Sequence, residues 1–468
     1  MEENKLAVKP LGLLMLELSI PAIIAQLVSI IYNMVDRIFI GRIENGTSAM
    51  AALSVSLPVI TLITAVTRLL GIGGAPLCAI KMGQKNQKGA EEILGTSFSA
   101  LIAAGVIMTA AILLFHEPLL AMFGADENTL GMAAEYITVY SLGTVFVMIA
   151  LGMNSYITTQ GFAGIGMCTV LIGAVLNIFL DALFINVFHM GVRGAAIATV
   201  IGQGVSAIWA LQFLFSDKSI LKIRKKYLKI RWKVLLPIMA LGVSPFTMSA
   251  TEGLVQISFN NQLLKYGGTM AVSTIAVLFS LWQFVTLPVQ GICQGAQPIL
   301  SYNYGAGNYK RVRGSFKLSI ALCLSYTVLM SVVFMMIPRG FSQIFTEDEK
   351  LLRLCAWALP LYVIGGTTFG AQICCQQSFM ALGQAKISLI LACLRKIILL
   401  VPLIYIMPAL LGGLEWAAGL AAPVADLVRQ PGPVAAIFLA ESVSDVLAAL
   451  STSVVFARFY RKRLADRP

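Results

Sequence analysis

The feature that most constrains this chain is a succession of long apolar stretches separated by short polar segments. A helix needs about 20 apolar residues to cross a bilayer, and twelve stretches of the 468-residue chain meet that length. They are residues 14–40, 50–80, 94–115, 130–155, 165–187, 193–215, 235–262, 270–300, 315–337, 352–380, 386–408 and 433–457. Charged residues make up 12% of the chain, against about 25% in soluble proteins. The sequence therefore predicts an all-α polytopic membrane protein with twelve transmembrane helices.

The basic residues predict how these spans are oriented. Lys and Arg outnumber Asp and Glu by 34 to 22. If both ends of the chain lie inside the cell, 23 basic residues fall in cytoplasmic segments and 8 in outer segments. Because cytoplasmic loops collect Lys and Arg, we expect a multi-pass protein of the plasma membrane with both termini cytoplasmic. No nucleic-acid partner is expected, since no solvated stretch is long enough to form a basic binding domain.

A basic segment, residues 217–234, divides the chain into two similar halves. Residues 18–21, 83–88 and 160–166 match residues 242–245, 305–310 and 377–383 in the same order. Each half holds six spans, so both halves enter the membrane in the same direction and form a parallel repeat. We expect two pseudo-symmetric six-helix lobes, residues 1–216 and 235–468, with a cleft between them. The basic segment is predicted to be a cytoplasmic linker whose charges face lipid headgroups.

Ionisable residues inside the spans of the first half are candidates for function, because charge is costly in hydrocarbon. Asp36 lies in the fragment YNMVDRIFIG, and Asp181 follows Asn177 by four residues in NIFLD. Residues four apart share a helix face, and both acids fall in the outer half of the lobe. The two carboxylates can share a proton or, with the Asn177 oxygen, coordinate a cation. In the alternative interpretation, Asp36 pairs with Arg37 and Asp181 with Asn177 alone.

The seventh span, in the second half, carries a polar stripe. Glu252, Gln256 and Asn260 follow one another at four-residue intervals. Facing a cleft, this stripe would contact substrate or a coupling ion, whereas between helices it would only hydrogen-bond its neighbours.

Further charges lie in the last two spans. Glu441 and Asp445 share a face of the twelfth span, where we expect a satisfied polar cluster near the outer loop. Arg395 and Lys396 are predicted to snorkel toward the interface. Arg68, in the second span, could neutralise one of the intramembrane acids.

Composition and motifs argue against an enzyme. No nucleotide-binding or hydrolase motif stands in a suitable context, and the two His lie far apart in loops. The eight cysteines form no CxxC or His-spaced set and are predicted to be small core residues. We expect no cofactor, and energy drawn from an ion gradient.

Several fragments together resemble a known family. These are SIPAIIAQLVSIIYNMVDRIFIGR, LGIGGAPLCAIKMGQ, NIFLDALFI and the G-x-x-N-x-K loop that occurs in both halves. They are similar to the MATE (multidrug and toxic compound extrusion) family of secondary antiporters, in its bacterial and archaeal branches. The resemblance implies a V-shaped pair of six-helix lobes that exports cationic, amphipathic drugs in exchange for H⁺ or Na⁺.

The resemblance also implies particular site residues. Asp36, Asn177 and Asp181 would form a proton or Na⁺ site, joined by Thr199. Glu252 would match a glutamate of the sodium-coupled branch, whose partner aspartate in the tenth span has no counterpart here. The residues expected to contact substrate are Gln26, Tyr32, Asn33, Tyr140, Met153, Asn154, Glu252, Gln256, Asn260 and Gln283.

The sequence thus predicts a monomeric antiporter that exports cationic drugs by alternating access. The alternative is a flippase for a lipid-linked saccharide or lipid precursor. Such a protein needs a strongly basic central cavity, and here only Arg68, Arg395 and Lys396 are available for one.

Overall fold

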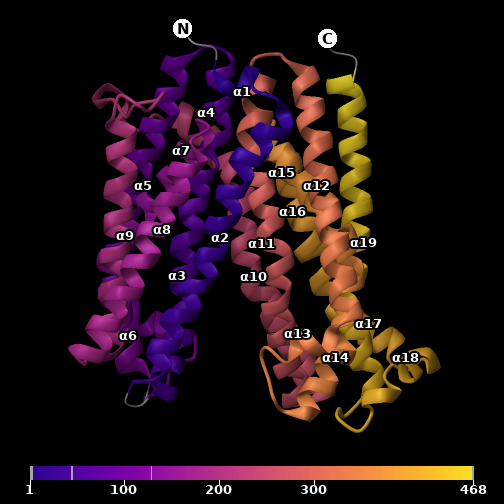
Figure 1. The fold of residues 1–468 in the computed structure, drawn as a ribbon. Coiled ribbons are helices and arrows are strands. Elements are labelled where there is room, and N and C mark those ends of the chain that lie inside the picture. The colour runs from indigo at the N-terminus through magenta and orange to yellow at the C-terminus, as the bar shows by residue number, and fades with distance from the viewer. Residues whose placement is uncertain (1–3, 44–45, 128, 466–468) are drawn as a thin grey trace. The chain divides into compact units, whose positions relative to one another are not determined.

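The computed structural model describes residues 4–43, 46–127 and 129–465, and within these ranges every regular element is a helix. Eleven of these helical segments are long and apolar enough to cross a membrane, and a bent pair of helices makes a twelfth (Figure 1). Each coincides with one of the twelve predicted stretches, so the predicted all-α membrane fold is confirmed. Arg467, one of the basic residues counted above, lies outside the described residues.

The helices of the first half follow one another with short connections. They are α1 (Lys5–Val8), α2 (Leu11–Gly41), α3 (Gly46–Thr67), η1 (Arg68–Ile72), α4 (Gly74–Gly83), α5 (Gln87–Met122), α6 (Leu130–Leu142), α7 (Thr144–Thr159), α8 (Ala163–Asp181), η2 (Ala182–Val187), α9 (Gly191–Phe215) and η3 (Lys225–Tyr227).

The second half consists of helices in the same way. They are α10 (Trp232–Gly267), α11 (Thr269–Gly305), α12 (Tyr309–Met336), α13 (Pro338–Ser342), α14 (Glu349–Val363), η4 (Ile364–Thr368), α15 (Phe369–Ala381), α16 (Ala385–Cys393), η5 (Leu394–Leu400), α17 (Val401–Leu411), α18 (Glu415–Leu420), η6 (Ala422–Val424), α19 (Pro431–Tyr460) and η7 (Arg461–Ala465).

The chain forms two compact units. Unit 1 comprises residues 1–249, 294–311 and 381–385, and unit 2 comprises residues 250–293, 312–380 and 386–468. Unit 1 therefore includes short pieces of the predicted second lobe. The lobe boundaries given above stay a prediction.

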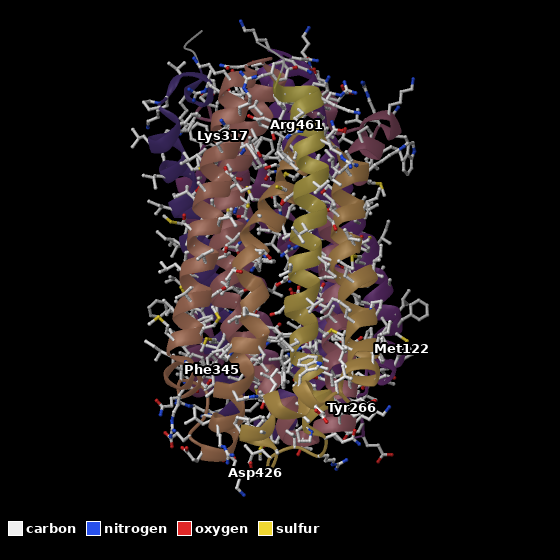
Figure 2. The ribbon with its side chains drawn as sticks, turned by 90° about the vertical axis from the view of Figure 1, so that its right-hand side faces the viewer. Met122, Tyr266, Lys317, Phe345, Asp426 and Arg461 are labelled. Carbon is white, nitrogen blue, oxygen red and sulfur yellow. The ribbon has the colours of Figure 1, made fainter. Side chains whose placement is uncertain are left out.

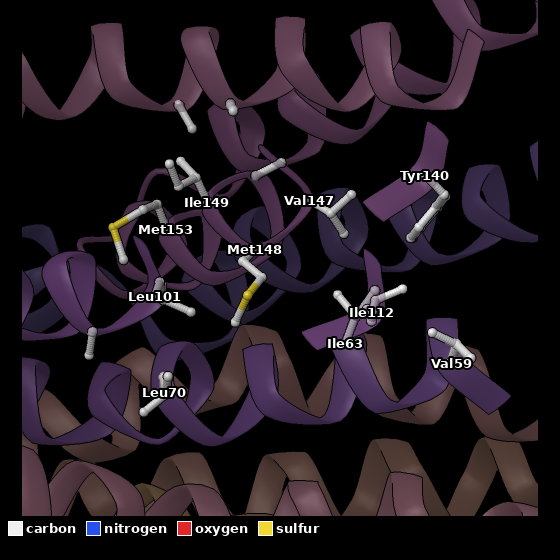
Figure 3. Close-up of a cluster of buried hydrophobic side chains, with 14 of the residues drawn as sticks. Val59, Ile63, Leu70, Leu101, Ile112, Tyr140, Val147, Met148, Ile149 and Met153 are labelled. Carbon is white, nitrogen blue, oxygen red and sulfur yellow. The ribbon is translucent and has the colours of Figure 1, made fainter. Parts of the chain in front are cut away.

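Unit 1 has a continuous apolar core between its helices. Figure 3 shows part of this core, where Ile63 of α3, Leu101 of α5 and Met148 of α7 gather with their neighbours. The bend of 56° between α6 and α7 falls at Gly143. A Cβ atom on Gly143 would come within 2.5 Å of Val200 Cγ2, so a larger residue at this bend would collide with α9.

The two G-x-x-N-x-K loops fold alike. Lys85 and its counterpart Gly307 both adopt positive φ angles, 59° and 74°. The next residue in each loop then caps a helix: the Asn86 side chain accepts from the Gly89 N–H, and the Asn308 side chain accepts from the Arg311 N–H. The repeat seen in the sequence is thus a repeat of local backbone structure.

The basic linker is folded onto unit 1. Arg224 Nε lies 2.6 Å from Glu91 Oε2, and Arg231 Nη1 lies 2.6 Å from Glu92 Oε1, both acids being on α5. The Leu221 backbone N–H donates to a Gln160 side chain at 2.8 Å. Arg224 and Arg231 thus pair with acids at the start of α5, and the contact of linker charges with lipid headgroups stays a prediction.

The helices of unit 2 have two opposite ends, which the labelled residues mark. Figure 2 shows Lys317 and Arg461 toward one end of its helices. Tyr266, Phe345 and Asp426 lie toward the other end (Figure 2). The long segment that precedes α19 also folds at this second end, as α18 and η6.

That segment is anchored to α14 through two side chains. Trp357 Nε1 donates to the Leu420 carbonyl at 2.9 Å, and Arg353 forms a bidentate pair with Asp426. The segment is thus an ordered cap over α14.

Candidate functional site

Three helices of unit 1 bring the predicted ion-site residues together. Asp36 lies on α2, Asn177 and Asp181 on α8, and Thr199 on α9. Helix α8 packs against both α2 and α9. The approach of α8 to α9 depends on Gly173, since a Cβ atom there would lie 2.3 Å from Ser206 Oγ.

The Asn177 amide connects two of these helices. In the orientation that best satisfies its neighbours, the amide nitrogen donates to Asp181 Oδ2 at 3.3 Å, and the amide oxygen accepts from the Thr199 N–H at 3.2 Å. In the opposite orientation the nitrogen donates to Thr199 Oγ1 at 3.3 Å. Asn177 therefore ties α8 to α9 in either orientation, beside Asp181.

Both acids of the group are buried and incompletely hydrogen-bonded. Asp36 is 9% exposed and Asp181 is 0% exposed. The Oδ1 atom of each has no hydrogen-bond partner among the described residues. A buried carboxylate oxygen without a donor is costly, so each acid has an oxygen available for a proton or a cation.

The alternative pairing of Asp36 with Arg37 is not observed. Arg37 is exposed, and no salt bridge joins the two side chains among the residues described. The charge of Arg37 still acts on Asp36. The charge of Asp36 acts in turn on Asp181 and on the buried Tyr136 hydroxyl, so these three groups share one region.

A small cavity with polar and apolar lining residues lies one helical turn from the two acids. Its volume is about 50 Å³. It is lined by Ser29, Tyr32, Ala150, Leu151, Thr169, Val170, Gly173, Ala174, Asn177, Thr199, Gln203 and Ser206. A drug-sized ligand needs about 300 Å³ or more, so the cavity has room for waters or a small ion.

Some of these lining residues were not predicted from the sequence. Ser29, Thr169, Gln203 and Ser206 are ordinary polar residues in apolar spans. Their spacing could have identified two of them. Gln203 follows Thr199 by one helical turn and Thr169 precedes Asn177 by two, so each lies on the same helix face as a predicted site residue.

The predicted substrate residues of unit 1 are dispersed. Tyr140 and Met153 are 6% and 0% exposed and belong to the apolar core (Figure 3). Tyr32 lines the small cavity, and Asn154 lines a second one of about 40 Å³ with Gln294.

Two more of the predicted substrate residues lie on α2. Gln26 is half-buried, whereas Asn33 is exposed, with its amide donating to the Ser29 carbonyl at 2.6 Å. Contact of any residue of this set with a substrate stays a prediction.

The polar stripe of α10 lies on the surface of unit 2. Glu252 and Gln256 are exposed, as is Gln283 on α11, while Asn260 is half-buried. The Glu252 side chain is 78% exposed, and its Oε1 lies 3.6 Å from Lys396 Nζ. The prediction that Lys396 snorkels to the interface is therefore wrong, because its ammonium group turns toward this acid.

Arg395 is the centre of a buried ionic network in unit 2. Its Nη2 lies 2.9 Å from Glu441 Oε1, and its Nε lies 2.7 Å from Asp445 Oδ1. The guanidinium carbon also stands 4.8 Å from the centre of the Phe369 ring. Arg395 is only 8% exposed, so the prediction that it snorkels to the interface is wrong as well.

The expected polar cluster of Glu441 and Asp445 is only partly satisfied by this network. One oxygen of each acid, Glu441 Oε2 and Asp445 Oδ2, has no hydrogen-bond partner among the described residues. The charge of Glu252 acts on Glu441. The acid that Glu252 influences therefore lies in the twelfth span. The tenth span, where the sodium-coupled branch has its partner aspartate, contributes no such acid.

Comparisons with known proteins agree with this architecture. The chain is 28% identical over 407 residues to a multidrug export protein MepA of Staphylococcus aureus, covering 86% of this chain and 89% of the relative. It is 26% identical over 420 residues to MepA of Staphylococcus saprophyticus, covering 89% and 92%.

Solved structures show the same fold. One is described as the outward-facing conformation of a multidrug resistance MATE family transporter of the MOP superfamily. It matches with a TM-score of 0.85 and 20% identity over 98% of both chains. Another, of MATE in the straight conformation, matches with a TM-score of 0.87 and 20% identity over 98% and 99%.

A family model supplies the assignment. The model MatE matches residues 21–183 and 246–406, one segment in each half of the repeat and together more than half of the sequence. This chain belongs to the MatE family of membrane transporters.

Proposed function

We propose that this protein exports cationic, amphipathic small molecules across the plasma membrane in exchange for H⁺ or Na⁺. The observation that carries the proposal is the pair of buried acids in unit 1, Asp36 and Asp181. Each has a carboxylate oxygen without a hydrogen-bond partner in the described part of the chain, near a cavity too small for a drug. Such a place suits a coupling ion. The curated relatives are multidrug export proteins, which supports the assignment of the exported cargo.

The polar surface of unit 2 supports a path for that cargo. Glu252, Gln256 and Gln283 are exposed within membrane-spanning helices. Polar side chains seldom face lipid at this depth and instead line water-filled cavities or protein contacts. The Glu252 carboxylate can bind an organic cation. When no cargo is bound, the same carboxylate pairs with the Lys396 ammonium group.

The mechanism that we propose couples the two sites through conformation. Binding of H⁺ or Na⁺ at Asp36 and Asp181 reshapes α2, α8 and α9 and favours the state that releases the drug outward. Loss of the ion to the cytoplasm resets the cycle. Coupling of this kind requires that ion and drug stabilise different conformations.

A lipid-precursor flippase is the less favoured alternative. Its anionic cargo needs unpaired basic groups, but Arg395 is bound by Glu441 and Asp445. Lys396 lies next to Glu252. Two of the three basic residues available for such a cavity are therefore already engaged with acids.

Efflux from reconstituted vesicles tests the proposal. Ethidium transport is measured with an imposed pH gradient, with an imposed Na⁺ gradient, and with neither. We expect transport with one of the two gradients and none without a gradient. In the Asp36→Asn variant, which keeps the shape of the side chain but cannot ionise, transport should fall to the level of empty vesicles.

The matched control is Glu135→Gln, which changes an exposed acid on α6 of the same unit. It should transport like the unmodified protein. Efflux that proceeds without any gradient contradicts antiport, and full activity of Asp36→Asn places the coupling ion elsewhere.

A further inference from the structure

Three cysteines from three different helices meet inside unit 2. Cys293 lies on α11, Cys323 on α12 and Cys374 on α15, and all three Sγ atoms lie within 4.8 Å of one another. The Sγ atoms of Cys293 and Cys323 are 3.9 Å apart. All three residues are buried, with exposures of 5%, 0% and 1%. We propose that this thiol cluster binds one trivalent thiophilic metalloid, with arsenite as the representative ligand.

The spacing of the sulfur atoms suits a single bound atom. Arsenic(III) binds three thiolates as a pyramid, and with bonds about as long as the ~2.3 Å of a zinc–thiolate bond its sulfurs lie about 3.4 Å apart. The Sγ atoms of Cys293 and Cys323 are 3.9 Å apart and all three lie within 4.8 Å of one another, so side-chain rotation must bring them closer on binding. The helices are held close together, since a Cβ atom on Gly370 of α15 would lie 2.6 Å from the Cys323 carbonyl oxygen.

The charge balance of the cluster selects a trivalent ligand. Among the described residues, the strongest electrostatic influences on the three thiols come from one another, from Cys375 and from the Ser378 hydroxyl, and none of these groups is positively charged. Three thiolates around a monovalent or divalent metal would leave a buried negative charge, which is costly in a low-dielectric interior. Three thiolates around a trivalent metalloid form a neutral complex.

The binding reaction is balanced without any oxidant. One molecule of arsenous acid, which is uncharged at neutral pH, meets three thiols. Three S–H bonds and three As–O bonds break, and three As–S bonds form. Each thiol proton forms an O–H bond with a departing hydroxide, so three molecules of water leave. Arsenic remains trivalent throughout, and the cysteines are not oxidised.

Binding would link α11, α12 and α15 through one atom. Helix α11 also carries Gln283, a predicted substrate contact. If the proposed transport function holds, arsenite should therefore inhibit efflux. The binding site itself does not depend on that function, and the experiment below measures binding alone.

Native mass spectrometry of the reduced, full-length protein in detergent tests the site. With arsenite, we expect a single adduct whose mass equals one arsenic atom less three hydrogens. Arsenic X-ray absorption should show three sulfur neighbours. In Cys323→Ala the affinity for arsenite should fall by at least about 100-fold, because only two of the three As–S bonds can form.

A second ligand shows whether a variant loses arsenite binding because it lacks the third thiol or because it is misfolded. Phenylarsine oxide requires only two thiols, so Cys323→Ala should still bind it through Cys293 and Cys374. Cys293→Ala, tested in parallel, should behave in the same way. The control Cys355→Ala removes a fully buried cysteine of α14 that lies outside the cluster and should bind arsenite normally.

Three results would each overturn the proposal. The first is arsenite binding to Cys323→Ala and Cys293→Ala with unchanged affinity. The second is an arsenic atom with fewer than three sulfur neighbours in the unmodified protein. The third is tighter binding of Zn²⁺ than of arsenite at the same three cysteines, since this would contradict the charge argument.

Discussion

At the scale of single residues, the two units handle buried charge in opposite ways. Asp36, Asp181, Glu441 and Asp445 each have one carboxylate oxygen without a hydrogen-bond partner among the described residues, but only Glu441 and Asp445 form ion pairs with a buried arginine, Arg395, at 2.9 and 2.7 Å. A buried acid without such an ion pair can exchange a proton or an ion, while the arginine with its two acids mainly holds helices together. We therefore assign a coupling role to Asp36 and Asp181 and a structural role to Arg395.

The structural role of Arg395 predicts a large loss of stability on its removal. Arg395→Met leaves Glu441 and Asp445 without their cation, and breaking a buried pair in this way costs about 3–5 kcal/mol. Thermal unfolding in detergent should show a clear drop in midpoint. Adding Glu441→Gln and Asp445→Asn should recover part of this loss.

An exposed ion pair supplies the control for this prediction. Arg353 and Asp426 form a bidentate pair, with side chains that are 50% and 58% exposed. Arg353→Met should cost about 0–1 kcal/mol, as exposed pairs do. Equal effects of the two substitutions would show that burial does not strengthen the Arg395 network.

At the scale of helices, three of the intramembrane ionisable residues lie at or next to breaks in regular α-helix. The π-helical segment η2 starts directly after Asp181, and η5 contains Arg395 and Lys396. Wider turns of this kind often occur at functional sites. The two segments occupy the fifth span of each half. In the first half this π-helical segment follows an acid, Asp181. In the second half it contains two basic residues, Arg395 and Lys396.

Close packing of α8 and α9 should be sensitive to a single methyl group. In Gly173→Ala the new Cβ would lie 2.3 Å from Ser206 Oγ, and overpacking of this kind costs about 1–3 kcal/mol. Thermal unfolding of the variant checks this loss. The double variant Gly173→Ala/Ser206→Ala, which removes the clashing oxygen, should regain most of it.

The same helix contains a control glycine. Nothing lies within 4 Å of a Cβ built on Gly164 of α8. Gly164→Ala should be neutral or stabilise by up to about 1 kcal/mol through its better helix propensity. Destabilisation of Gly164→Ala as large as that of Gly173→Ala would refute the packing explanation.

At the scale of the whole molecule, the chain is a duplicated fold with unequal chemistry. The family model matches one segment in each half, and the G-x-x-N-x-K loops form the same capped turn twice. When the match of residues 18–21 with 242–245 is extended along the same helices, Asp36 nevertheless corresponds to the neutral Asn260. The two halves therefore share backbone geometry but have different charged residues at equivalent positions.

The distribution of basic residues predicts the orientation of the whole chain. With 23 basic residues on one side and 8 on the other, we expect both termini in the cytoplasm. In a bacterial host, green fluorescent protein fused to the C-terminus should fluoresce, and alkaline phosphatase fused there should be inactive.

A second fusion site checks the opposite side of the membrane. Alkaline phosphatase inserted after residue 413, in the segment before α18, should be active. The reverse pattern at the two positions would invert the proposed direction of transport.

The sequence by itself determined the features that depend on local pattern. The thickness of the hydrocarbon sets the length of a span, so the twelve spans could be counted from apolar length alone. The repeat and the four-residue spacing of Asn177 and Asp181 were likewise readable along the chain.

Only the tertiary structure decided which distant residues meet. Arg395 could not be paired with Glu441 and Asp445 from the sequence, because α16–α17 and α19 are brought together by packing. The convergence of three cysteines from α11, α12 and α15 was equally hidden. Membrane insertion depends on the apolar length of each segment, which can be read along the chain. Sites depend instead on how helices pack against one another. Packing brings together residues that are far apart in the sequence, and no periodic pattern relates their positions.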